Sequence, residues 1–154
     1  TGSVDTDLSG PQTVYIVYRL DNTDSGYNAV GFSRGISGGS QLAYRTRHTG
    51  NDFDSIVDSD GNVFAASYGT DIGTPHILCG VFQSNAVIGR DDQSAESFSG
   101  FATGSYSSFG IGYDAESGVD HWEGPISAAL VYGAAHGSST RSTVFTYLGD
   151  RYGF

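Results

Sequence analysis

The sequence of 154 residues contains no lysine and no methionine, and all seven of its basic residues are arginine. Seventeen acidic residues oppose them, so the formal net charge is -10 and the pI is near 4.4. Nucleic-acid binding depends on clustered lysine and arginine that displace the counterions of phosphates. Anionic membrane surfaces likewise attract basic segments. The shortage of positive charge therefore excludes nucleic acid as a partner and argues against an anionic membrane surface.

Cysteine is almost absent as well, since Cys79 is the only one. A single cysteine excludes a disulfide within the chain, and its apolar neighbours predict a small buried side chain rather than a reactive thiol. The longest apolar run, residues 128–132, is far too short to cross a bilayer, so we expect no membrane insertion. The first residues lack the basic and apolar regions of a signal peptide. Without an initiator methionine, the chain is expected to be a processed protein or one part of a longer one.

Glutamate is also scarce, because 14 of the acidic residues are aspartate and only Glu96, Glu116 and Glu123 are glutamate. An acidic surface without lysine is typical of a protein that works in concentrated salt. We therefore expect a halophilic or extracellular setting.

Glycine and aromatic residues are abundant. The 23 glycines, with serine and proline, make up about 31% of the chain, a share that by itself suggests low complexity. Disordered chains are poor in aromatics, however, and this one has ten tyrosines, nine phenylalanines and one tryptophan. The aromatics alternate with β-branched residues, and the glycines fall between these runs. The pattern predicts a folded chain with many turns.

Most of the apolar runs have the length and composition of strands. In residues 13–20, apolar side chains occupy both the odd and the even positions. Because successive side chains of a strand point to opposite faces, this predicts a strand that is covered on both faces. Asp60 and Gly61 lie between two apolar runs and predict a hairpin. One helix is expected near the C-terminus, capped by Ser138 or Ser139 and ended by Gly149, with an apolar stripe of Val144, Phe145 and Leu148. The predicted strands are 13–20, 27–34, 41–48, 55–57, 63–66, 75–83, 85–90, 107–113 and 124–133.

The C-terminal part carries the most specific motif. His121-Trp122-Glu123-Gly124-Pro125-Ile126-Ser127 is followed by the apolar Leu130-Val131-Tyr132, then the helix, then Tyr147-Leu148-Gly149-Asp150-Arg151-Tyr152-Gly153-Phe154. This order resembles the end of laminin-G-like domains of the concanavalin A-like lectin and glucanase superfamily.

The resemblance implies an all-β fold, a concanavalin A-like jelly-roll sandwich of two antiparallel sheets with one short C-terminal helix. It covers residues 13–154 and leaves residues 1–12 as an N-terminal segment. Trp122 is then expected to be buried at the start of a core strand, and Gly124 to allow a close backbone approach or a bulge. The sequence departs from the family at Ala128 or Ala129, where an acid is frequent, and at Ala135-His136, where a leucine leads into the helix.

Some relatives of this fold are retaining glycoside hydrolases, which need two carboxylates on an E-x-D-x-x-E strand. The nearest match here is Gly118-Val119-Asp120-His121-Trp122-Glu123, in which glycine stands where the nucleophile belongs. The four histidines are widely spaced and show no zinc-site pattern. We therefore expect no enzymatic activity and no catalytic residues.

Calcium is the cofactor that the resemblance suggests, because laminin-G-like domains often bind it through carboxylates at the rim of the sandwich. Three aspartate pairs have the required oxygen atoms. Asp58 and Asp60 belong to the predicted hairpin turn, and hairpin formation explains them better than an EF-hand, whose closing glutamate is missing. The candidate metal ligands are Asp52, Asp54, Asp91 and Asp92.

Sugar binding in such folds uses exposed aromatic rings that stack on the apolar face of a pyranose. The candidate ligand-binding residues are Tyr27, Phe53, Phe98, Phe101 and Tyr106. Residues 94–108 place three of these rings among small residues, which suits a binding loop or, equally, a glycine-rich strand that packs them inward.

The leading functional hypothesis is a non-catalytic module that recognises carbohydrate or cell-surface glycans on an extracellular or virion surface. The alternative is a structural decoration, spike or adhesion module of a virion or cell surface, which acts through contacts with other copies or subunits of a larger assembly.

Overall fold

The computed structural model describes most of the chain. In residues 28–35, 41–47, 53–57 and 108–109 it gives the course of the backbone and, among the side chains, only that of Ile56. The described residues are 10–21, 28–35, 41–47, 53–57, 62–66, 68, 72–91, 94–103, 108–112, 122 and 124–153.

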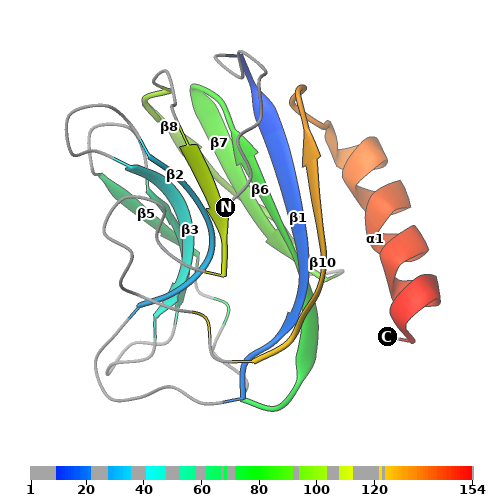
Figure 1. The fold of residues 1–154 in the computed structure, drawn as a ribbon. Coiled ribbons are helices and arrows are strands. Elements are labelled where there is room, and N and C mark those ends of the chain that lie inside the picture. The colour runs from blue at the N-terminus through cyan, green and yellow to red at the C-terminus, as the bar shows by residue number, and fades with distance from the viewer. Residues whose placement is uncertain are drawn as a thin grey trace.

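Ten strands of the described residues form two antiparallel five-stranded sheets, which pack face to face (Figure 1). The first, called sheet A, has the order β10 (Ile126–Tyr132), β1 (Gln12–Arg19), β6 (Pro75–Phe82), β7 (Asn85–Arg90) and β8 (Glu96–Ser99). The second, sheet B, has the order β5 (Val63–Ala66), β4 (Phe53–Val57), β3 (Gln41–Arg47), β2 (Asn28–Gly35) and β9 (Ser108–Ile111). The helix α1 (Ser138–Tyr152) lies on the outer side of sheet A, so the molecule has three layers.

The predicted strands all exist, with ends within two residues of those expected. The strand β1 is buried on both faces from Gln12 to Tyr18, as its sequence predicts. The predicted hairpin also forms, because β4 and β5 pair with Val57 opposite Val63. Its turn, with Asp58 and Asp60, lies outside the described residues. The strand β8, with a single large apolar side chain in four residues, is predicted only as the alternative to a binding loop in residues 94–108.

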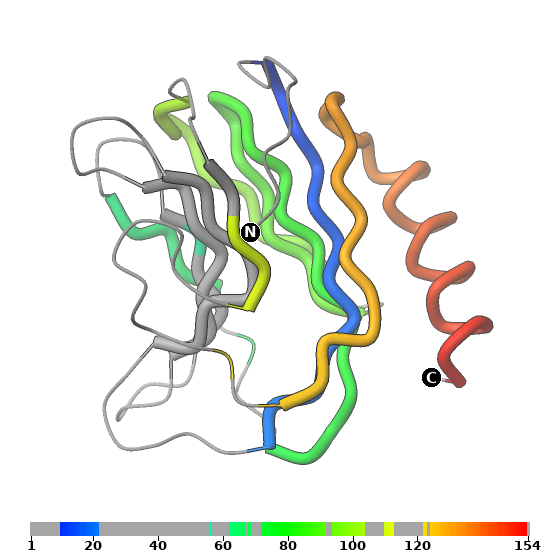
Figure 2. Tube along the Cα trace, in the orientation of Figure 1, coloured from blue at the N-terminus to red at the C-terminus, as the bar shows by residue number. Residues whose placement is uncertain are grey.

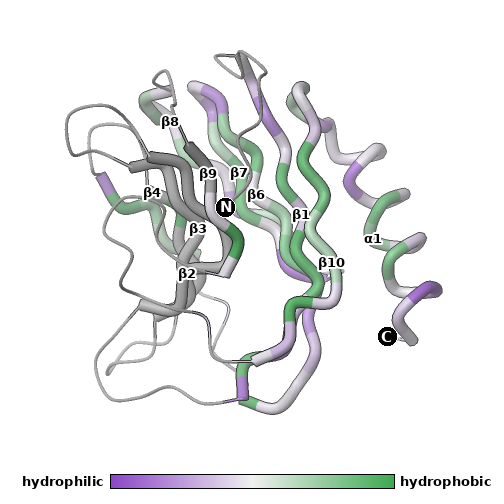
Figure 3. The backbone as a smooth tube through the Cα atoms, in the orientation of Figure 1, coloured by the Kyte–Doolittle hydropathy of each residue, from purple (hydrophilic) through white to green (hydrophobic). Residues whose placement is uncertain are grey.

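Sheet A is covered on both faces because each face belongs to a different hydrophobic cluster. The inner cluster joins the two sheets and includes Val14, Ile16 and Tyr18 of β1. The outer cluster includes Tyr15 and Val17 of the same strand and packs against the helix through Leu148. Successive side chains of a strand point to opposite faces, so the alternation along β1 supplies both clusters. Figure 3 shows the apolar strands of sheet A between the more polar helix and the rest of the molecule.

The helix ends differently from the prediction at both termini. Its N-cap is Gly137, and no side chain caps it, so neither Ser138 nor Ser139 has the expected role. Gly149 stays helical, and the helix continues to Tyr152. Gly153 ends it by adopting the left-handed conformation (φ 78°), and its N–H donates to the carbonyl of Gly149. Glycine is favoured there because it enters this conformation without a steric penalty. The predicted apolar stripe does face sheet A.

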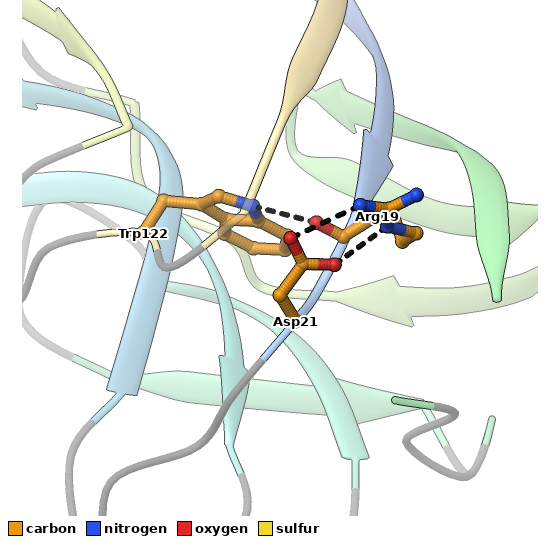
Figure 4. A network of polar contacts seen from close by, with 3 residues as sticks. All are labelled: Arg19, Asp21 and Trp122. Carbon is orange, nitrogen blue, oxygen red and sulfur yellow. Dashed lines mark hydrogen bonds and ion pairs between the residues drawn. The ribbon is translucent and has the colours of Figure 1, made fainter. Parts of the chain in front are cut away.

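Trp122, which Figure 4 shows with Arg19 and Asp21, and Gly124 fix the end of β1 to the chain that enters β10. The indole ring is 9% exposed, lies edge-on to Tyr18 at 4.7 Å, and donates its Nε1–H to the carbonyl of Arg19 at 3.3 Å. Gly124 has a φ of 142°, and a Cβ atom built there would lie 2.1 Å from the same carbonyl oxygen. The backbone can pass this close only because glycine has no side chain. The exposed guanidinium of Arg19 pairs with Asp21 and lowers the pKa of that carboxyl group.

Candidate functional site

The candidate sugar-binding aromatics of residues 94–108 lie against the core where the structure describes them. Phe101 is 3% exposed and lies between Phe64, at 5.4 Å, and Phe82, at 5.9 Å. Phe98, on β8, is half-buried and packs against the same inner cluster. Of the two alternatives for residues 94–108, Phe101 therefore follows the inward packing and not the exposed platform, because its ring lies between the sheets. Tyr27, Tyr106 and the side chain of Phe53 lie outside the described residues.

Among the candidate metal ligands, Asp91 is the one whose side chain the structure describes. Its Oδ2 accepts a hydrogen bond from Nδ1 of His76 at 2.7 Å, and its Oδ1 accepts one from the backbone N–H of Ile77 at 2.6 Å. Its backbone has a φ of 51°, and its N–H donates to the carbonyl of Ile77. Asp91 thus ties the end of β7 to the start of β6.

No group of three metal-ligating side chains occurs within the described part of the chain. Both oxygens of Asp91 already accept hydrogen bonds from protein groups, so this carboxylate fits a structural role better than a metal site. Asp52, Asp92 and the side chain of Asp54 lie outside the described residues, as do Asp120 and Glu123 of the incomplete hydrolase motif.

A groove of about 650 Å³ runs along α1 where the helix leaves part of sheet A uncovered. We call it the α1 groove. One wall is a single face of the helix, formed by Ser138, Arg141, Ser142, Phe145, Thr146, Gly149 and Asp150. The other wall consists of the start of β6 and the segment after β7, formed by Thr74, Pro75, His76, Ile77, Asp91 and Ala95.

The groove exists because the helix packs on one side only. Leu148 is 1% exposed and anchors the helix to the outer cluster of sheet A. Phe145 both packs against the outer cluster and lines the groove, and its ring lies edge-on to that of Tyr15 at 5.9 Å. A Cβ atom built at Gly89 would lie 3.7 Å from the Phe145 ring, so this ring reaches the surface of β7 at Gly89. Beyond Phe145, the helix face carries hydroxyl and charged groups, and these border the groove.

The start of the helix is held firmly against β1. The hydroxyl of Thr13 donates to the carbonyl of Ala134 at 2.7 Å and accepts the N–H of His136 at 2.9 Å. The imidazole of His136 lies 4.5 Å from the ring of Tyr132, and its Nδ1 is 2.9 Å from the hydroxyl of Tyr15. These contacts join the loop after β10 to β1, so the helical wall of the groove starts from a fixed position.

Arg141 places a guanidinium at the N-terminal end of the groove. Its Nη1 donates to the carbonyl of His136 at 2.8 Å. Beneath it, burial raises the pKa of the Cys79 thiol to about 12 and raises the pKa of Tyr15 above its ordinary value of 10.0, while Arg141 opposes both shifts. Cys79 is fully buried, as predicted. The thiol and phenol therefore belong to the protein interior rather than to the lining of the groove.

Sequence reasoning missed the groove because its residues come from three distant segments. A four-residue spacing of polar side chains, Ser138, Ser142, Thr146 and Asp150, was the available signal. Residues four apart share one helix face. A polar row of this kind is also what the solvent-exposed face of any amphipathic helix carries, so by itself it does not indicate a groove.

The comparisons with known proteins rest on structure. No protein-family model matches the chain, and no match is found among the curated proteins. Among solved structures, the carbohydrate-binding module CBM40 of a Ruminococcus gnavus sialidase, bound to α2,3 sialyllactose, matches with a TM-score of 0.69. The sequences are 8% identical, and the match covers 88% of this chain and 82% of that one.

Two further structures match to a similar extent. A heptameric pentraxin from Limulus polyphemus is 14% identical with a TM-score of 0.67, over 88% of this chain and 69% of that chain. Domain 4 of a Geobacillus stearothermophilus arabinanase, in complex with arabinotriose, is 14% identical with a TM-score of 0.66, over 88% and 66%. Sialidases also match, but this chain covers only 23% of the Trypanosoma rangeli enzyme.

These likenesses show the fold. The chain is a concanavalin A-like jelly roll of two antiparallel sheets with one C-terminal helix, as the sequence predicted. The narrower laminin-G subtype stays a prediction. Within the described residues, no helix is long and apolar enough to span a membrane.

Proposed function

We propose that this chain is a non-catalytic recognition module that binds glycans. The observation that carries the proposal is the extent of the match to two carbohydrate-binding structures, one with bound sialyllactose and one with bound arabinotriose. In both cases the match spans most of this chain. The α1 groove supports the proposal, because it combines hydroxyl, carboxylate and guanidinium groups with one aromatic ring. Sites for small ligands are typically concave and combine apolar surface with a few placed polar groups.

The proposal of a module without catalysis is supported by how this chain matches enzymes. The similarity to the Trypanosoma rangeli sialidase covers less than a quarter of that protein. In the sequence, Gly118 occupies the position that the hydrolase motif reserves for its nucleophile. An extracellular or virion-surface location is part of the same proposal.

A glycan array tests the proposed function. We expect binding at micromolar strength to at least one class of glycan, which corresponds to about -8 kcal/mol. Calorimetry with isolated sialyllactose and arabinotriose would check the array. The array should be run with chelator and with added calcium, because the sequence predicts aspartate ligands for calcium at the rim of the sandwich. A blank array under every condition would contradict glycan recognition.

The second candidate function is a structural module that acts through contacts between copies. The pentraxin match is to a heptamer, which is the first reason to consider it. The second is the edge strand β10, which has seven residues without a charge and leaves Val131 41% exposed. Edge strands usually carry charges or are short, because an unprotected edge can pair with another chain. Light scattering that gives a stable oligomer without ligand, together with a blank glycan array, would favour this function.

A further inference from the structure

We infer that the α1 groove is the glycan-binding site of this protein and that it binds an extended, uncharged oligosaccharide rather than one terminal acidic sugar. The inference rests on the proposed function and specifies its site and its class of ligand.

The dimensions of the groove favour a chain. Its lining extends along α1 from Ser138 to Asp150, and 12 residues of helix rise about 18 Å. This length exceeds that of any single monosaccharide. The volume of about 650 Å³ lies within the range of about 300–1,000 Å³ that is common for ligand sites. A ligand that fills the groove must therefore be elongated and must have several units.

The polar groups of the helical wall repeat along this length. Ser138, Ser142, Thr146 and Asp150 succeed one another at four-residue intervals, which places one oxygen-bearing side chain about every 6 Å. Thr146 donates its own hydroxyl proton to the carbonyl of Ser142 at 3.0 Å, so its oxygen can accept a bond from a ligand. A regular row of donors and acceptors suits a ligand whose hydroxyl groups also repeat.

Phe145 supplies the apolar surface that sugar binding requires. It is half-buried, and its ring packs edge-on against Tyr15 and lies close to the backbone of Gly89. It contributes to the lining between the first and last turns of the helix. A sugar unit can pack its apolar face against this ring while neighbouring units reach the hydroxyl groups.

The charges of the groove favour a neutral ligand. Asp91 and His76 are hydrogen-bonded to each other, and the Asp91 carboxylate adds no positive charge to the groove. Arg141 at one end and the exposed Asp150 near the other have opposite charges. The lining therefore has no excess of positive charge, and the chain as a whole carries -10. Binding an acidic sugar would require a cationic site, because a carboxylate is stabilised by nearby positive charge.

The test is calorimetric titration with arabino- and cello-oligosaccharides of one to four units and with 3′-sialyllactose. We expect affinity to rise at least tenfold from the monosaccharide to the trisaccharide in one neutral series. Ser142→Tyr fills the middle of the groove and should lower that affinity at least tenfold. Thr143→Tyr changes the adjacent exposed residue, which does not line the groove, and should leave the affinity unchanged.

Several outcomes would overturn the inference. If Ser142→Tyr binds the oligosaccharide as tightly as the wild-type protein, the site does not lie in the α1 groove, although the protein still binds glycans. Equal affinity for one and three units would exclude an extended ligand, and stronger binding of sialyllactose than of every neutral trisaccharide would exclude an uncharged one. If Ser142→Tyr does not fold, amide chemical-shift changes in the wild-type protein decide, and they must be largest in residues 138–150. A blank array with no titration heat would overturn the proposed function itself.

Discussion

At the scale of single residues, Gly124 has no room for a side chain. Its φ of 142° is strained for any residue with a side chain, and the carbonyl oxygen of Arg19 occupies the space that a Cβ atom needs. A side chain at position 124 would affect more than the local turn, because the carbonyl of Arg19 also accepts the indole hydrogen bond of Trp122. A shift of the backbone here would disturb both the ring and the entry into β10.

We therefore predict that Gly124→Ala lowers the free energy of unfolding by at least about 2 kcal/mol, since backbone strain and steric overlap add. Urea denaturation followed by tryptophan fluorescence measures the change. Gly133→Ala is the matched control, because a Cβ atom at Gly133 has no neighbour within 4 Å. Equal stability of the two variants would contradict the close approach at Gly124.

The buried thiol and phenol predict a loss of stability in alkali. Burial raises the pKa of Cys79 from 9.0 to about 12 and raises that of Tyr15 from 10.0. Above about pH 9 the unfolded chain loses these protons, whereas the folded chain keeps them up to its higher pKa values. The free energy of unfolding is therefore at its full value below about pH 9 and falls as the pH rises. The slope reaches about 1.4 kcal/mol per pH unit for each group.

Denaturation curves from pH 8 to 11 measure this loss. Cys79→Ala and Tyr15→Phe should each make the decline shallower, even where they lower stability at pH 7. A decline that stays as steep in both variants would assign the alkaline sensitivity to other groups.

At the scale of elements, α1 combines a packed face with a face that serves the groove. Leu148 is buried in the outer cluster, whereas its neighbour Tyr147 is 54% exposed. The helix depends on this packing, because an isolated helix of 15 residues is marginally stable in water.

We predict that Leu148→Ala lowers the free energy of unfolding by about 2–5 kcal/mol, because it leaves a cavity between helix and sheet. Tyr147→Ala should cost less than about 1 kcal/mol, although it removes a larger side chain from the adjacent position. Thermal denaturation with both variants checks the contrast. Similar losses would show that the helix is not held mainly by its inner face.

The same scale shows what could be predicted from the sequence. Strands such as β1 and β6 are long, apolar and rich in β-branched residues, and their patterns lead directly to the observed elements. The strand β8 is predicted only as an alternative to a loop, because its four residues contain one phenylalanine among serine and glutamate. The sequence predicts the helix end at Gly149, whereas the structure ends the helix at Gly153, because the sequence does not reveal which glycine adopts a positive φ. The groove could not be predicted from the sequence, because its two walls come together only when the helix packs on the sheet.

At the scale of the whole molecule, the net charge of -10 on 154 residues is the dominant electrostatic feature. Like charges repel one another in the compact state more than in the unfolded chain. Salt weakens this repulsion, since the screening length falls from about 10 Å at 0.1 M to about 3 Å at 1 M.

We predict that the melting temperature rises between 0.05 and 1 M sodium chloride at pH 7, as a consequence of screening. Near the pI of 4.4 the net charge vanishes, so the same salt series should have a much smaller effect there. Differential scanning calorimetry at the two pH values provides the comparison. Equal stability at low and high salt at pH 7 would contradict adaptation to a salty setting.

The position of β1 in sheet A has a consequence for how the protein is made. Its two neighbours are β6 and β10, and Tyr15 lies opposite Leu130, which is 115 positions further along the chain. Figure 2 shows β1 in blue between β6, in green, and β10, in orange, so both neighbours come from later parts of the chain. Pairings between such distant residues form slowly, because the intervening chain must first be ordered. During synthesis, the second edge of β1 therefore stays unpaired until residue 132 has left the ribosome, and an unpaired apolar edge is prone to aggregation.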